Sequence, residues 1–183
     1  MSISSNHASD RRRLPLILAA ACSTGALLAL SSPTASAVAP LTATATFDCG
    51  SWGNGSATLT AADNGTTKSI KLTSSAITMP SGSSADPNSI TTTLKVSKTA
   101  GGVTSQVQFS AKANPGMSYP NPITLGPLKL SSGTLATGNS TNSVVLSAPA
   151  TATNWSLQIV TSSPTSATVY CVATSVQSAA FVW

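Results

Sequence analysis

The chain of 183 residues has few charged and aromatic side chains, which make up 7% and 4% of it. It contains a single histidine, His7, and no glutamate, and its only arginines are Arg11, Arg12 and Arg13. If the first 37 residues are removed on export, as argued below, the remaining chain has neither histidine nor arginine. A Ser-His-Asp or Cys-His hydrolase needs an imidazole base, so these mechanisms are excluded for such a chain.

Other common catalytic arrangements also lack their residues. Beyond residue 37 the acids are Asp48, Asp63 and Asp86, and the last two lie in turn sequences, where aspartate commonly stabilises the backbone. A pair of catalytic carboxylates for glycoside hydrolysis is therefore not expected. No serine stands three residues before a lysine, zinc would need histidine and thiolate ligands, and calcium would need more carboxylates. We expect no catalysis, no metal and no cofactor.

Residues 1–37 have the parts of a secretory signal peptide. Three arginines precede the apolar run 14–30 (LPLILAAACSTGALLAL), and Ala35 and Ala37 form an A-x-A cleavage site. The run is short for a membrane span and is interrupted at residues 23–25. Lipid attachment at Cys22 is less favoured because apolar sequence continues beyond it, and the export route stays open. We predict cleavage after Ala37 and a secreted or envelope-associated mature chain with no membrane span.

Two cysteines, Cys49 and Cys171, remain in the predicted mature chain. Outside the cell one intramolecular disulfide is expected, which would join the first strand to a strand near the C-terminus. The six remaining lysines are dispersed along the chain and no arginine accompanies them. This distribution does not form a basic patch, so no nucleic-acid partner is expected.

Apolar and polar residues alternate with a period of two through residues 38–183, the predicted single domain. Between Leu41 and Cys49 the intervening residues are threonines and Asp48, which indicates a strand with one buried and one wet face. Serine and threonine, 24 of each in this range, favour strands and turns over helices. We predict an antiparallel Greek-key, immunoglobulin-like β-sandwich of about 8–10 short strands.

Three aromatic residues are the candidate ligand-binding residues. Trp52 lies among glycines beside Cys49, where it could stack on a sugar ring or cover the disulfide, and the second role is favoured. Tyr119 lies in the long Pro/Gly/Asn loop 112–122, where an exposed ring would suit ligand contact. Trp183 is the last residue and could either plug one end of the fold or be exposed.

Two other aromatic residues are predicted to be structural. Trp155 begins the alternating run Trp155, Leu157 and Ile159, so it is expected to lie in the core. Tyr170 directly precedes Cys171 and is expected to pack against its neighbours around the disulfide.

The signal-like N-terminus, the richness in Ala, Thr and Ser, and the widely spaced cysteines resemble the small secreted β-sandwich proteins of actinobacteria, many of which have no known activity. The chain is also similar to bacterial cellulose- and chitin-binding modules and to the enediyne-carrier apoproteins. It departs from the binding modules in having only three tryptophans, and from the carriers in lacking a second disulfide.

These features together predict a secreted, non-catalytic structural or interaction module of the cell envelope or extracellular space. Its partner would be an envelope glycan or another envelope protein. The alternatives are a carbohydrate-binding module that uses exposed aromatic rings and a carrier of a small hydrophobic ligand.

Overall fold

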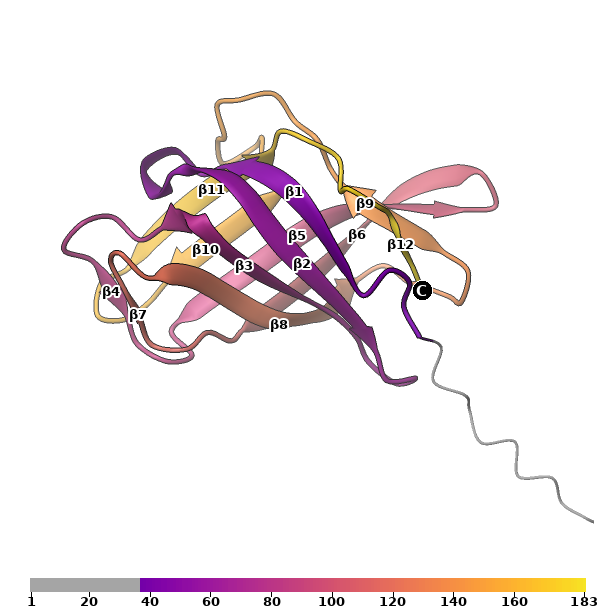
Figure 1. Cartoon of the computed structure of the whole chain (residues 1–183), viewed down its shortest axis with the longest axis horizontal. Helices are drawn as coiled ribbons and strands as arrows, with labels where there is room; N and C mark the ends of the chain where they lie inside the picture. Colours follow the sequence, from indigo (N-terminus) through magenta and orange to yellow (C-terminus); the bar gives the residue numbers. More distant parts are fainter. Residues whose placement is uncertain (1–36) are drawn as a thin grey trace, which may run out of the picture. The chain divides into compact units, whose positions relative to one another are not determined.

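The structure, a computed structural model, describes residues 37–183, and the predicted signal peptide up to residue 36 lies outside the described residues. The described part contains twelve strands and one short 3-10 turn, Gly50–Trp52 (Figure 1). None of its segments is a helix long and apolar enough to cross a membrane. The strands are β1 (Thr42–Asp48), β2 (Asn54–Asp63), β3 (Lys68–Thr78), β4 (Ser84–Ala85), β5 (Ile90–Ala100), β6 (Val103–Lys112), β7 (Met117–Ser118), β8 (Pro122–Ser132), β9 (Ser140–Ser143), β10 (Leu157–Thr161), β11 (Ala167–Ala173) and β12 (Phe181–Val182).

Eight of these strands close into an antiparallel barrel. Their order is β10-β11-β1-β2-β3-β8-β6-β5, and β5 pairs back to β10 from Leu94↔Leu157 to Ile90↔Thr161. Because this ladder completes the ring, no gap divides the strands into two separate sheets. The prediction of an immunoglobulin-like Greek-key sandwich is therefore wrong, although the all-β class is right. Both architectures bury one face of every strand, so the same alternating sequence serves either.

Backbone irregularities allow the sheet to curve. The sequence Gly126-Pro127 predicts an edge strand or a bulge, and the structure shows a register shift here inside β8, which lies between β3 and β6. Gly126 has a φ of +98°, and a Cβ at this position would lie 2.6 Å from the backbone nitrogen of Leu128. Only glycine fits such a position without strain, and bulges of this kind bend a strand toward closure.

The barrel interior is filled by its own side chains. Inward-facing residues of the eight strands are fully or almost fully buried, and they include Phe47, Leu59, Ile70, Leu94, Phe109, Leu125 and Ile159. An eight-stranded barrel is just wide enough for side chains to fill it. A ligand of this protein is therefore expected to bind at the rim or on the outer wall.

Short strands lie at the two ends of the barrel (Figure 1). At one end β4 pairs with β7 and buries Ala85 and Met117. At the other end β12 pairs with β9, and Trp183 stacks on Phe109 with ring centroids 5.6 Å apart. The indole nitrogen of Trp183 donates a hydrogen bond of 2.9 Å to the hydroxyl of Thr141. The C-terminal residue therefore acts as a plug, one of the two roles considered for it.

Candidate functional site

The predicted disulfide between Cys49 and Cys171 is present, and both residues are buried. It joins the end of β1 to β11, as expected. The short turn that follows Cys49 contacts β11 and leaves Trp52 only 4% exposed. Trp52 is therefore part of the core beside the disulfide and offers no open ring to a ligand.

The structure does not bring the three candidate residues together on one exposed face. Tyr119 is 51% exposed and follows β7, whereas Trp183 is 1% exposed and follows β12 at the other end of the barrel (Figure 1). Tyr119 is thus the only one of the three that presents a large surface to solvent.

Trp155 lies on the outer wall of the barrel, so the prediction that it belongs to the core is wrong. The alternation breaks at Ser156, which is fully buried although it directly precedes the buried Leu157. Ser156 is held there by hydrogen bonds on both sides. Its carbonyl accepts from the Lys95 N–H at 2.7 Å, and its hydroxyl accepts from the Ala173 N–H at 2.6 Å. This local break turns Trp155 outward and leaves its side chain half-buried.

Trp155 forms an aromatic platform with Tyr170 and Lys95. The two rings have centroids 6.4 Å apart and planes inclined by 39°. The ammonium of Lys95 lies 3.4 Å from the centroid of the Trp155 ring, in a cation–π contact with one ring face. Burial lowers the pKa of Lys95 below its ordinary value. Lys95 thus occupies one face of the indole and Tyr170 packs beside it, and together they leave Trp155 half-buried.

A row of hydrogen-bonding side chains continues from the platform across the outer wall. Tyr170 of β11 lies opposite Gln158 of β10, which in turn lies opposite Thr93 of β5. The hydroxyl of Thr93 lies 3.0 Å from that of Ser110 on β6. A half-buried pair of aromatic rings thus adjoins amide and hydroxyl groups, a combination suited to a ligand with one apolar face and many hydroxyls.

Lys95 and Trp155 are the residues of the platform that sequence reasoning missed. Lys95 is one of six lysines dispersed along the sequence. Trp155 lies two residues before Leu157 and four before Ile159, so the alternation predicts that it faces the core with them. The feature of the sequence that could have revealed the platform is Tyr170. It directly precedes the buried Cys171 on a strand, so its ring must point to the opposite, outer face.

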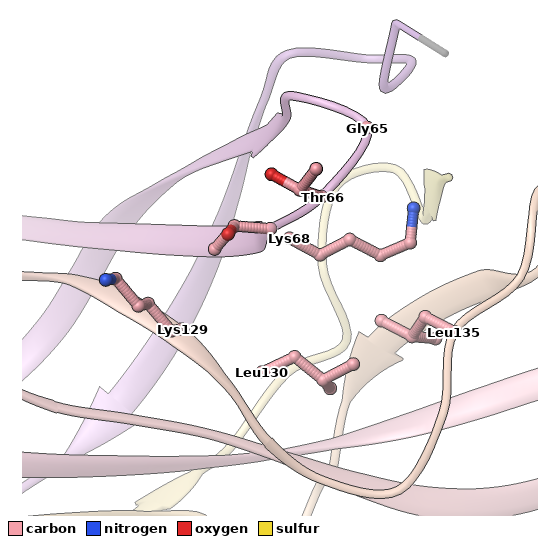
Figure 2. Close-up of a pocket in the computed structure, with 7 residues that line it drawn as sticks. Gly65, Thr66, Lys68, Lys129, Leu130 and Leu135 are labelled. Carbon is pink, nitrogen blue, oxygen red and sulfur yellow. The ribbon is translucent and has the colours of Figure 1, made fainter. Parts of the chain in front are cut away.

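A second candidate is a hollow of about 410 Å³ at the barrel rim (Figure 2). The turn 65–67 and the stem of Lys68 lie on one side of it, and Leu130 and Leu135 lie on the other. Lys129 of β8 also lines this hollow and a smaller one of about 230 Å³. Both hollows are open at the surface of the barrel and do not reach into its packed interior.

Lys68 is neutralised by Asp63 across the base of the β2–β3 turn, and the Asp63 side chain is only 3% exposed. Its ammonium also lies 5.7 Å from the centroid of the Trp183 ring. Burial favours the neutral acid, but hydrogen bonds from Lys68 and from the Gly65 N–H outweigh it, so the pKa of Asp63 lies below its ordinary value of 3.8. The pair therefore fixes the turn that forms one wall of the hollow.

Replacing Asp63 with asparagine is expected to lower the free energy of unfolding at pH 7 by roughly 1.5–3 kcal/mol, because the half-buried Lys68 loses its charged partner. A carboxylate with a lowered pKa stabilises fully above its unfolded pKa, and this contribution disappears as the pH falls through the folded pKa. The difference between Asp63→Asn and the parent chain should therefore shrink below about pH 4, as measured by urea denaturation at a series of pH values. Asp48→Asn, at an aspartate with no lysine partner in the described part, is the control. An equal difference at pH 7 and at pH 2.5 would contradict this account.

No family model, no curated protein and no solved structure matches the chain. Within residues 37–183, no group of three or more His, Cys, Asp or Glu side chains is placed to hold a metal ion. The candidate sites therefore have to be judged on their own chemistry.

Proposed function

We propose that the protein is an exported, non-catalytic interaction module that binds a glycan of the cell envelope through the Trp155–Tyr170 platform. The observation that carries this proposal is the position of Trp155. Two of the three tryptophans, Trp52 and Trp183, are buried in the barrel, whereas Trp155 lies half-buried on its outer wall beside a second aromatic ring.

The chemistry of the platform suits a sugar. One face of a pyranose ring carries C–H groups that pack on an aromatic ring, while its hydroxyls need donors and acceptors at the margin. Gln158 and Thr93 supply both kinds of group next to Tyr170. The Lys95 ammonium beneath the indole fixes the ring in place, so less conformational freedom is lost on binding.

Export and the absence of catalysis complete the proposal. The N-terminal sequence has the pattern of a secretory signal, and a buried disulfide is typical of proteins that fold outside the cytosol. Without histidine or glutamate, residues 38–183 have few groups that can act as a general base near neutral pH.

Retention on insoluble polysaccharides tests this function. We expect the mature chain to be retained on at least one of cellulose, chitin and purified cell wall. Trp155→Ala should weaken retention at least about tenfold, because a central aromatic anchor usually contributes more than 1.4 kcal/mol. Gln158→Ala should weaken it less, since it removes one hydrogen-bonding group at the margin.

Tyr119→Ala is the matched control, because it removes an exposed aromatic ring from a loop away from the platform. It should leave retention unchanged. Circular dichroism of each variant verifies that the barrel has folded. Failure of the parent chain to bind all three polymers, or equal retention of the folded Trp155→Ala variant, would refute the proposal.

A further inference from the structure

We propose that the rim hollow between the β2–β3 turn and β8 is a second binding site, which takes a small amphiphilic anion. The ligand class is an organic carboxylate, sulfonate or sulfate attached to an apolar chain or ring. This site is independent of the aromatic platform, since the two share no residue.

The size and lining of the hollow support a small ligand. Its volume of about 410 Å³ falls within the range of small-molecule sites, which are concave and combine apolar walls with a few polar groups. Leu130 and Leu135 provide an apolar surface on one side of the hollow. Leu135 is only 8% exposed, so the packing around it fixes its position. Figure 2 shows the two leucines facing the stem of Lys68 across the hollow.

The charge of the hollow selects the sign of the ligand. Lys68 is already paired with Asp63, so its ammonium contributes little net positive charge. Lys129 is exposed, and neither a hydrogen bond nor an ion pair connects its ammonium to another residue of the described part. The linings of both hollows contain no acid, and Asp63, beside the first hollow, is already paired with Lys68. An anionic group at Lys129 would therefore meet an uncompensated positive charge.

The charged and apolar groups that border the hollow come in part from the same strand, β8. Lys129 and Leu130 are consecutive on β8, so their side chains leave opposite sides of the strand at the margin of the hollow. Figure 2 shows the Lys129 side chain directed away from the two leucines, so its ammonium lies at the outer margin of the hollow. A ligand that packs on Leu130 and Leu135 would therefore present its anionic group at the margin of the hollow, toward Lys129.

The turn that forms the opposite wall is itself rigid. The side-chain oxygen of Asn64 accepts hydrogen bonds from the backbone N–H groups of Thr66 and Thr67, at 3.2 and 2.7 Å. The Thr66 hydroxyl donates to the same oxygen at 3.1 Å. A wall that is fixed before binding reduces the entropy lost when a ligand enters.

Titration with 8-anilinonaphthalene-1-sulfonate, a fluorescent amphiphilic anion, tests the site. We expect saturable binding to the folded mature chain at one site, with displacement by decanoate and weaker displacement by the uncharged decanol. Lys129→Glu should weaken binding at least about fivefold, because it replaces attraction with repulsion at the anionic group.

Lys71→Glu is the matched control, since it changes the net charge equally at an exposed lysine of β3 that lines neither hollow. It should leave the affinity within about twofold of the parent value. Equal weakening by both substitutions would show that only net charge matters, and absence of saturable binding would show that no site exists. Either result overturns the proposal, and neither affects retention on polysaccharides.

Discussion

Removing the disulfide is expected to lower the free energy of unfolding by about 5 kcal/mol, the largest effect of any change considered for this protein. Cys49 and Cys171 are 122 residues apart, so the bond closes most of the mature chain into one loop. Such a constraint reduces the entropy of the unfolded chain, and the reduction grows with the logarithm of loop length. Since a domain of this size is usually stabilised by only about 5–15 kcal/mol, the loss is large.

The measurement is guanidinium chloride denaturation of the parent chain and of a Cys49→Ala, Cys171→Ala double variant, each with and without reductant. The reductant should lower the midpoint of the parent chain and leave that of the double variant unchanged. This internal control separates loss of the covalent bond from loss of packing, because both cysteines are buried. A double variant as stable as the oxidised parent chain would show that the bond contributes little.

The strands themselves could be predicted well from the sequence. Alternation between Leu41 and Cys49 corresponds to β1, and the turn sequence that contains Asp63 corresponds to the connection between β2 and β3. These features depend on neighbouring residues, whose side chains alternate between two faces regardless of how the strands are later arranged. Residues 144–146 (VVL) also have the composition of a strand, but the structure has β9 at Ser140–Ser143 instead.

Closure of the barrel could not be predicted in the same way. It depends on pairing between β5 and β10, whose residues Leu94 and Leu157 are far apart in the sequence. An inward-facing leucine looks the same in a sandwich and in a barrel. What distinguishes the two is whether the last edges meet, and this is decided by curvature at positions such as Gly126.

The candidate site was missed because of one residue. The alternation that leads into β10 predicts that Trp155 faces inward with Leu157. Hydrogen bonds to β5 and β11 instead bury Ser156 in the barrel wall. These partners lie about 60 and 17 residues away, so no local pattern reveals them. A single irregularity of this kind converts a predicted core tryptophan into a half-buried ring on the outer wall.

The two binding proposals follow from the same property of the fold. Because the interior is packed and Trp183 closes one end, ligand contacts are left to the outer wall and the rim. The platform and the rim hollow occupy different parts of that surface. A protein with two such sites could hold a small amphiphile while attached to a polymer, which the two sets of variants can examine separately.

Truncating the plug is the second change with a large expected effect. Trp183→Ala should lower the free energy of unfolding by about 3–5 kcal/mol, in the range for a fully buried aromatic residue. The substitution removes the stacking on Phe109 and the edge contact with Phe181, and it leaves the buried hydroxyl of Thr141 without its donor. In thermal unfolding the midpoint should fall by roughly 10 °C.

Val182→Ala is the matched control, because this neighbouring residue is 45% exposed and its truncation should cost less than about 0.5 kcal/mol. Trp183→Phe should fall between the two, since it keeps most of the ring volume but loses the N–H donor to Thr141. A Trp183→Ala variant no less stable than Val182→Ala would mean that the barrel end closes without its last residue. The C-terminal residue would then contribute little to stability. Phe109 of β6 and Phe181 of β12 would have to hold this end of the barrel together without it.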